Sequence, residues 1–197
     1  MAIPTCYAYP LENYRMTTRD HVQDAQDETL DQFFQRMSAE VSKQGPRTTV
    51  EAVLLTHIHS YPHILLLDTS GPRGYRLPGG KLDPGESELA GLKRSLTNKL
   101  CPTGAISWDL GELLGVYYRP EFTQNLYPFM PPHSTLPKET IKVFLCQLPQ
   151  ETEFIQAKNL KLVAIPLHEL KMNTSKFGGY LSDIPTLLSR ININLIK

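Results

Sequence analysis

Long apolar runs, secretory features and an excess of charge of either sign are all missing from this sequence of 197 residues. No apolar stretch approaches the roughly 20 residues that span a bilayer, and the opening residues lack a basic segment followed by an apolar one. We therefore expect an intracellular protein with no membrane partner. Lysine plus arginine (20) equal aspartate plus glutamate (20), so any binding of nucleic acid must depend on a local site.

Cysteine is scarce, and this favours buried, reduced thiols. The three cysteines are an odd number without a CxxC pair, which argues against a disulfide framework and a zinc site. His57, His59 and His63 invite a metal interpretation, because alternation would place the first two on one face of a strand. No cysteine or nearby acid completes a tetrahedral ligand set, so we expect a solvated hairpin without a metal.

Residues 77–101, LPGGKLDPGESELAGLKRSLTNKLC, combine two turn signals with a helical pattern. The turns at residues 78–80 (PGG) and 83–85 (DPG) would lead a strand into a helix N-terminus. Leucines recur at helical spacing after them, which predicts a helix. A phosphate-cradling function for the glycines alone is a weaker interpretation, because no Lys-Ser/Thr ending follows them.

This segment resembles the Nudix box, the element that binds magnesium in Nudix hydrolases. Four positions fall in register with the family pattern: Gly80, Glu86, Arg94 and Leu96. Where the family has its metal-binding glutamates, the chain has Ser95, Asn98 and Lys99. Positions i, i+3 and i+4 share one helix face, so carboxylates there would converge on a cation, whereas two neutral groups and an ammonium would not. We expect no catalytic residue, no metal and no cofactor.

Apolar patterns predict the remaining elements. We expect helices at residues 27–44, 167–172 and 183–192, and strands at residues 49–56, 64–68, 106–118, 140–148 and 160–165. Residues 119–139 hold five prolines and form a long loop, which is usually functional or interfacial. The order predicts an α/β protein, an α/β/α sandwich of Nudix type with a mixed central sheet. Residues 1–26 are predicted as an N-terminal arm packed on a single Nudix-like domain of residues 27–197.

Beyond the box, most of the chain resembles the small, Nudix-fold subunit of eukaryotic pre-mRNA cleavage factor I. The likeness rests on these segments in one order: YPLENY, FQRM, TVEAVLL, PHILLL, RLPGGKLDPGE, GLKR, YRPEF, YPFMPPH, LPKE, NLKLVAIPLHEL and IPTLLSRIN. It implies a non-catalytic protein of the nucleus that acts in pre-mRNA 3′-end cleavage and polyadenylation and recognises a short UGUA-like element in single-stranded RNA. It also implies a homodimer, a larger RRM-containing partner subunit and poly(A) polymerase as a further partner.

The resemblance assigns RNA contacts residue by residue. Glu51 corresponds to an acid that reads a base edge by accepting its protons. Tyr75 corresponds to an aromatic that stacks on an unpaired base, and Leu77 follows it into the site. Phe177 and Gly178 fall where the family has an RNA-contacting pair. Without the resemblance, Glu51 would be a solvated strand acid and SKFGGY a turn with a packed phenylalanine.

Two positions in this predicted site depart from the family. Phe33 stands where the family has an RNA-contacting arginine, and a phenyl ring cannot donate hydrogen bonds to a base or a phosphate. Gln32 or Arg36 could take over that function. The loop SGPRGY has one extra residue, so Arg73 or the following glycine replaces an aromatic, and an arginine plane can also stack on a base. We therefore expect an altered RNA sequence preference.

Three residues correspond to the family's contacts with its RRM-containing partner. Tyr127 and Phe129 lie in YPFMPP, and Leu187 lies in the predicted last helix. Aromatic side chains on a proline-stiffened loop lose little rotamer entropy on binding, which suits an interface. The alternative is a loop folded onto its own core.

Two other functions remain compatible with the sequence. An assembly module with little RNA affinity would fit the changes at Phe33 and in the SGPRGY loop. A protein that binds or hydrolyses dinucleoside polyphosphates would need displaced acids such as Asp83, Glu86, Glu88 or Glu112.

Overall fold

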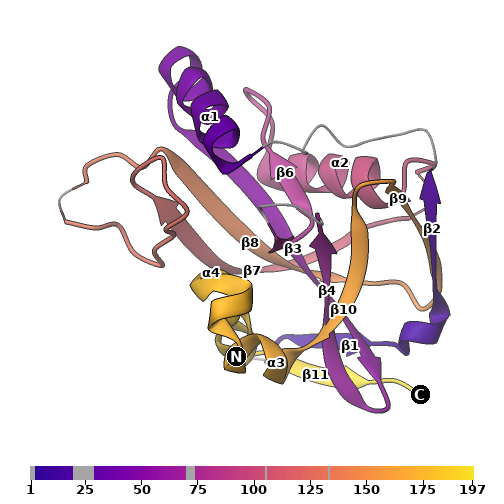
Figure 1. Cartoon of the computed structure of the whole chain (residues 1–197). Coiled ribbons are helices and arrows are strands. Elements are labelled where there is room, and N and C mark those ends of the chain that lie inside the picture. The colour runs from indigo at the N-terminus through magenta and orange to yellow at the C-terminus, as the bar shows by residue number, and fades with distance from the viewer. Residues whose placement is uncertain (1–2, 20–28, 70–73, 105, 133) are drawn as a thin grey trace.

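The computed structural model describes residues 3–19, 29–69, 74–104, 106–132 and 134–197 (Figure 1). Its elements in chain order are β1 Thr5–Ala8, the 3₁₀ helix η1 Leu11–Asn13, β2 Tyr14–Arg19, α1 Leu30–Gln44, β3 Arg47–Ile58, β4 Tyr61–Asp68, β5 Tyr75–Arg76, β6 Gly79–Lys81, α2 Glu88–Leu100, β7 Asp109–Arg119, β8 Glu139–Gln147, β9 Thr152–Ala157, β10 Lys161–Pro166, α3 Leu167–Met172, α4 Thr174–Leu188 and β11 Asn192–Leu195.

A mixed sheet in the order β10-β4-β3-β8-β7 forms the centre, with β5 paired to β4 and β6 to β3. Successive residues of β3 face opposite sides, so that Val50 and Leu54 belong to one apolar cluster and Val53 and Leu55 to another. Helix α2, with β2 and β9, buries the first face; α3 and α4, with β1 and β11, bury the second (Figure 1). The predicted α/β/α sandwich with a mixed sheet is confirmed.

Helix α1 begins with reciprocal capping and ends at a glycine. The hydroxyl of Thr29 accepts a hydrogen bond from the backbone N–H of Gln32 at 3.3 Å, and the Gln32 side chain accepts one from the N–H of Thr29 at 2.9 Å. Gly45 has a φ of 82°, which suits glycine at a helix C-terminus. The prediction of this helix is confirmed, while its expected start at residues 27 and 28 lies outside the described residues.

The predicted last helix at residues 183–192 is wrong at both ends. Helix α4 begins at Thr174, and Asn192 opens the strand β11. This strand pairs in parallel with β1, from Thr5 opposite Asn192 to Ala8 opposite Leu195. The partner strand lies at the other end of the sequence, so periodicity within the segment could not reveal the pairing.

The part of the predicted arm that the structure describes supplies the strands β1 and β2. Strand β2 pairs in parallel with β9, which the sequence patterns did not predict. The boundary that we expected between residues 26 and 27 lies outside the described residues. No helix in the described ranges combines the length and the apolarity that crossing a membrane requires.

The expected solvated histidine hairpin is wrong for two of its three histidines. The hairpin of β3 and β4 forms as predicted, and His59 is exposed at its turn. His57 and His63 are each only 7% exposed, and His57 Nε2 lies 2.7 Å from the carbonyl oxygen of Ile196. His57 is covered because Ile196, which follows β11, contacts it. His63 lies opposite Pro166 of the neighbouring strand β10, and its Nδ1 is 2.7 Å from the carbonyl oxygen of Tyr61.

Candidate functional site

The box helix α2 forms with other side chains at the positions of the metal ligands. Its N-terminus is capped by Ser87, whose hydroxyl accepts a hydrogen bond from the N–H of Ala90 at 3.3 Å. Ser95 is buried so close to Gly80 that a methyl group on that glycine would lie 2.5 Å from its hydroxyl. Lys99 donates a hydrogen bond to the carbonyl of Gly79. The ammonium of Lys99 is therefore directed toward β6, where the box begins.

The acids of the box are engaged in ion pairs. Glu86 accepts two hydrogen bonds from Arg94, and this contact, with a hydrogen bond from the backbone N–H of Asp83, holds the pKa of Glu86 at about 2. Glu88 is paired with Lys142. Within the described ranges, no group of three or more histidine, cysteine, aspartate and glutamate side chains is placed to hold a metal ion.

A cleft lies between α1, the sheet and α4. It consists of two hollows of about 260 and about 640 Å³ that share five lining residues, namely Phe33, Arg76, Arg119, Leu126 and Tyr180. Glu51 and Leu77 line the smaller hollow, whereas Tyr75, Phe177 and Gly178 line the larger one. The structure thus brings all the described residues of the predicted RNA site into one connected cleft. Arg73, the remaining member of that prediction, lies outside the described residues.

Glu51 lies in the smaller hollow, partly exposed, on the face of β3 that points toward α4. Its carboxylate accepts a hydrogen bond from the hydroxyl of Tyr180. Burial raises the pKa of Glu51, while the hydrogen bond from Tyr180 and the charges of Arg76 and Lys99 oppose that shift, and nearby Glu139 adds to it. Glu51 is therefore not the solvated strand acid that the sequence left as an alternative.

Glycine is required opposite Glu51. Strand β6 pairs with β3 so that Gly79 lies across from Glu51. A Cβ on Gly79 would lie 2.1 Å from the carbonyl oxygen of Val50 and 2.6 Å from the Cα of Glu51, closer than atoms can approach. The PGG turn of the box thus allows the close approach of two strands at the floor of the hollow.

An aromatic wall closes the larger hollow. The rings of Tyr75 and Phe177 lie 5.1 Å apart, and Lys176 Nζ lies 5.6 and 4.8 Å from their centroids. Gly178 interrupts α4 with a φ of 80°, so SKFGGY is a helical segment with a kink at that glycine, in place of the glycine-rich turn that the sequence left as an alternative. Phe177 is only 7% exposed, which agrees with the alternative of a packed phenylalanine, and Tyr75 offers more of its ring to solvent.

Phe33 is covered by arginines. It is 5% exposed, and the guanidinium carbons of Arg36 and Arg47 lie 5.7 and 5.5 Å from its centroid. Of the two suggested substitutes for the family's arginine, Arg36 lines the cleft, whereas Gln32 is engaged in the helix cap. Phe33 thus forms part of the cleft wall, but because arginines cover its ring, a bound molecule would contact a guanidinium group rather than the phenyl face.

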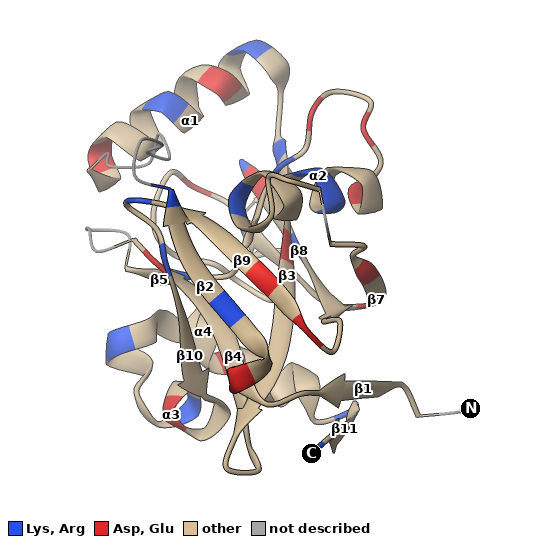
Figure 2. Cartoon of the chain, turned by 90° about the vertical axis from the view of Figure 1, so that its right-hand side faces the viewer, with Lys and Arg blue, Asp and Glu red and all other residues tan. Residues whose placement is uncertain are grey.

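Basic side chains outnumber acidic ones in the lining of the cleft, and some of them are held in ion pairs. Over the whole chain, Figure 2 shows basic and acidic residues interspersed over the elements, including along α1. Buried Glu139 lies 2.9 Å from Arg47 Nε and 2.9 Å from Arg119 Nε, and it accepts a hydrogen bond from Thr49 at 2.5 Å. These two of the arginines that line the cleft are therefore partly neutralised from below.

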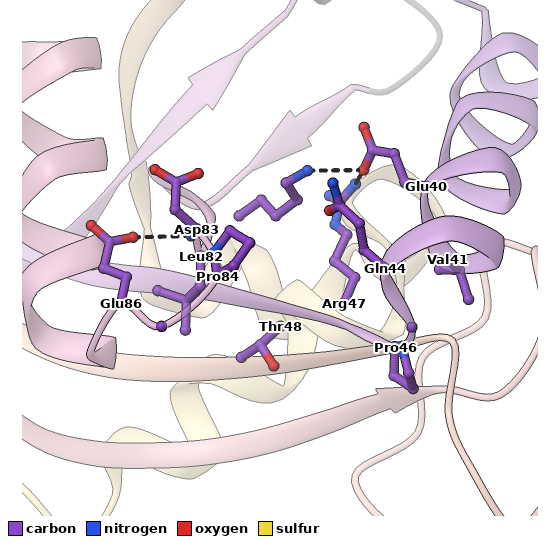
Figure 3. Close-up of a pocket in the computed structure, with 13 residues that line it drawn as sticks. Glu40, Val41, Gln44, Pro46, Arg47, Thr48, Leu82, Asp83, Pro84 and Glu86 are labelled. Carbon is purple, nitrogen blue, oxygen red and sulfur yellow. Dashed lines mark hydrogen bonds and ion pairs between the residues drawn. The ribbon is translucent and has the colours of Figure 1, made fainter.

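A third hollow, of about 280 Å³, lies between the end of α1 and the loop of residues 82–86 (Figure 3). Glu40 bridges its upper side, 3.2 Å from Lys81 Nζ and 3.9 Å from Arg47 Nη1, and Asp83 and Glu86 come from the opposite side. Among the residues that the structure describes, none of those in the predicted RNA or partner sites lines this hollow.

The predicted partner contacts divide into two places. The backbone of Tyr127 bridges to Tyr118 of β7, its ring lies 6.0 Å from that of Phe129, and Phe129 is 57% exposed. Tyr127 also lines the larger hollow of the cleft. Leu187 is partly buried against Gly115 of β7. The alternative of a loop folded on its core applies to neighbouring Leu126, which packs on the apolar cluster, but not to Phe129.

The sequence interpretation missed several residues that line the cleft: Arg76, Arg119, Leu126 and Tyr180. Tyr180 follows the SKFGG segment directly, and its position could have been inferred only with the kink at Gly178 known. Arg76 lies between two predicted contact residues, Tyr75 and Leu77, so its neighbourhood was the available signal.

Comparison with known proteins gives consistent matches over most of the chain. A family model of the Nudix type, described as a nucleotide hydrolase, matches residues 4–191. The protein named pre-mRNA cleavage factor Im 25 kDa subunit 2 of Arabidopsis thaliana is 42% identical over 192 residues, which are 96% of this chain and 95% of that protein. Subunit 1 from the same plant is 39% identical, over 96% of this chain and 86% of that protein. Cleavage and polyadenylation specificity factor subunit 5 of Dictyostelium discoideum is 40% identical over 83% of both.

Proposed function

Because the chain belongs to the Nudix family and, within it, to the 25 kDa subunits of pre-mRNA cleavage factor Im, we propose that it acts in pre-mRNA cleavage and polyadenylation. The resemblance noted in the sequence is confirmed at the level of the family. In our proposal the protein holds a short UGUA-like element of single-stranded RNA and scaffolds a larger RRM-containing subunit. It does so as a homodimer in the nucleus, with poly(A) polymerase as a further partner.

The observation that carries the RNA proposal is the convergence of separate segments on one cleft. Glu51 comes from β3, Tyr75 from β5, Leu77 from the loop after it, and Phe177 and Gly178 from α4, yet all line two connected hollows. Single-stranded RNA is read by stacking of unpaired bases on aromatic rings and by hydrogen bonds to base edges. A partly exposed tyrosine and a carboxylate in one cleft suit both kinds of contact.

The pairing of two cleft arginines supports binding through bases more than through phosphates. The chain has no net charge, and Arg47 and Arg119 share buried Glu139. These two arginines would release few counterions when RNA binds, and in our proposal log affinity falls only gently with log salt concentration.

The contacts of the box support a non-catalytic function. Ser95, Asn98 and Lys99 replace the metal-binding glutamates, and the ammonium of Lys99 donates to the carbonyl of Gly79. Glu86 is held by Arg94 rather than being available to a cation. The relatives carry the names of cleavage factor subunits, although the matching family model is described as a nucleotide hydrolase.

One observation favours the assembly module with little RNA affinity as a second candidate. Phe33 and Phe177 are both largely buried, so the cleft offers less stacking surface than its aromatic content indicates. In that case the exposed ring of Phe129 would carry the function through a partner protein.

An RNA titration, a capture experiment and a hydrolysis assay distinguish these functions. A randomised pool of short RNAs is titrated against the purified chain, and the enriched element is read at two salt concentrations. Selection of a UGUA-like element with weak salt dependence supports the proposal. Capture of an RRM-containing subunit without any RNA binding selects the assembly module. Turnover of a dinucleoside polyphosphate with magnesium, abolished by Glu86→Gln, would identify a hydrolase instead.

A further inference from the structure

We infer that Tyr180 is a positioning residue, which fixes the carboxylate of Glu51 for the recognition of an RNA base; this inference rests on the proposed function. It concerns a residue outside the set that the resemblance assigned to RNA. Three features of the described structure lead to it: the hydrogen bond between the two side chains, the support of the Tyr180 ring, and the confinement of the Glu51 stem.

The hydroxyl of Tyr180 is directed at Glu51 because the Tyr180 ring is packed against a neighbouring ring. It donates its hydrogen bond to Oε2 of Glu51. The ring itself packs edge-on against Tyr117, with the centroids 4.8 Å apart and an interplanar angle of 79°, and Tyr117 is buried. The kink at Gly178, with φ of 80°, separates Tyr180 from the first turn of α4. One short stretch of helix therefore supplies both the aromatic wall, through Phe177, and the contact with Glu51.

The stem of Glu51 is confined from the other side. A Cβ on Gly79 would lie 3.0 Å from the Cγ of Glu51, which shows how closely the backbone of β6 approaches this side chain. A glutamate normally loses rotamer freedom when it binds a ligand, and that loss weakens binding. Because Gly79 confines the stem and Tyr180 fixes Oε2, the direction of the whole carboxylate is set before RNA arrives.

Tyr180 also affects the protonation of Glu51. Groups from several elements face this carboxylate: Tyr180 on α4 with Tyr117 of β7 behind it, Glu139 on β8, Arg76 on β5 and Lys99 on α2. The same hollow holds Arg36, Glu40, Arg47, Lys81 and Arg119. Burial raises the pKa of Glu51, and the hydrogen bond from Tyr180 lowers it. Tyr180 thus helps to keep the carboxylate ionised, the form that only accepts hydrogen bonds.

The test is the variant Tyr180→Phe, which removes the hydroxyl and keeps the ring. Binding of a fluorescent UGUA-containing RNA is followed by anisotropy from mildly acidic to neutral pH. An ionised Glu51 is needed to accept a base N–H, so affinity should fall as pH falls through the pKa of Glu51. Without the Tyr180 hydrogen bond that pKa is higher, so the midpoint should move to higher pH, with about tenfold weaker binding at neutral pH.

Tyr14→Phe is the matched control. It removes the hydroxyl of a buried tyrosine on the opposite face of the sheet, which donates to the carbonyl of Pro149 at 2.9 Å and lines neither hollow of the cleft. We expect it to keep the wild-type midpoint. If Tyr180→Phe also keeps both the wild-type affinity and the wild-type midpoint, the inference is overturned.

A double-mutant cycle separates positioning from a merely structural contribution. In the Glu51→Ala background, which has no acceptor for the Tyr180 hydroxyl, the acidic midpoint should vanish, and adding Tyr180→Phe should cause no further loss. If Tyr180→Phe weakens RNA binding in this background by the same factor as in the wild type, Tyr180 acts independently of Glu51, which contradicts the inference.

A wild-type protein that binds no RNA at any pH would remove the proposed function. The effect of Tyr180 on Glu51 is then measured without RNA: NMR of the Glu51 carboxyl carbon during a pH titration gives the pKa of Glu51 in the wild type and in Tyr180→Phe. A higher pKa of Glu51 in Tyr180→Phe upholds the coupling, and an unchanged pKa overturns it.

Discussion

Arg94 holds Glu86 through two hydrogen bonds, from Nε to Oε1 at 2.8 Å and from Nη2 to Oε2 at 2.7 Å. The same guanidinium donates to the carbonyl of Lys81 at 3.1 Å, so the pair fastens the loop of residues 82–86 to α2. Two residues in register with the Nudix pattern thus connect parts of the box to one another. This pair therefore helps to hold the box together without a metal ion.

The pH dependence of the free energy of unfolding should reveal the pair of Glu86 and Arg94. The pKa of Glu86 in the folded chain is about 2, below its ordinary value of 4.5, because of Arg94. A lowered folded-state pKa stabilises the fold above the unfolded-state pKa, and this stabilisation is lost as pH falls toward 2. Urea unfolding of Glu86→Gln should therefore show a deficit in free energy of unfolding at neutral pH that shrinks in acid. Glu112→Gln, at an exposed strand position, is the control, and a deficit that does not vary with pH would refute the prediction.

Gly79→Ala should destabilise the protein by roughly 1–3 kcal/mol, since overpacking forces the backbone to shift. The added methyl group would collide with the carbonyl of Val50 at 2.1 Å. Gly179→Ala is the comparison, because a Cβ there meets nothing within 4 Å inside α4 and should stabilise by up to about 1 kcal/mol. Both are measured by urea unfolding. Equal stabilities of the two variants would show that the β3–β6 approach is looser than the structure has it.

Glu139→Gln should cost about 3–5 kcal/mol of unfolding free energy, because it removes the shared counter-charge of one buried and one partly buried guanidinium group. Those groups belong to Arg47 and Arg119, each with a nitrogen 2.9 Å from Glu139. The control is Glu169→Gln, which breaks an exposed pair with Lys176 and should cost less than about 1 kcal/mol. A small loss for Glu139→Gln, similar to the control, would argue that water reaches the buried cluster.

If the proposed partner site is right, the variant with Tyr127→Ala and Phe129→Ala should capture less RRM-containing subunit in a pull-down while its oligomeric state stays that of the wild type. Phe129 is 57% exposed and its ring lies 6.0 Å from that of Tyr127, so the two can bury a joint aromatic surface. Tyr61→Ala removes an equally exposed ring from the β3–β4 hairpin and should leave capture unchanged. Undiminished capture by the double variant would exclude this surface as the partner site.

Local patterns predicted individual helices and strands, including β8 and β10, but not which distant segments pair with each other. The spacing of apolar residues predicted α1, α2 and the β3–β4 hairpin, and α3 lies at residues 167–172 as expected. The pairings of β1 with β11 and of β2 with β9 join segments more than 100 residues apart, and no local period carries that information. The burial of His57 also depends on a residue distant in sequence, since it contacts the carbonyl of Ile196, and His63 lies opposite Pro166 of β10.

The candidate site was predictable where it depends on matched motifs and unpredictable where it depends on backbone geometry. Glu51, Tyr75, Leu77, Phe177 and Gly178 were identified from the resemblance, and they lie in one cleft. Tyr180 was missed because its contact with Glu51 needs the kink in α4, and a glycine within a helical pattern does not announce the φ it will adopt.

Recognition of RNA bases by Glu51 in this cleft is tested by comparing the wild-type protein with the variant Glu51→Ala. Wild-type protein and Glu51→Ala are each titrated with a short UGUA-containing RNA and with a scrambled RNA of the same composition. We expect the wild type to prefer the UGUA-containing RNA. Glu51→Ala should bind that RNA more weakly and lose the preference, while both proteins have the same unfolding free energy. Equal affinities of the wild type for both RNAs, unchanged by the substitution, would contradict recognition by Glu51.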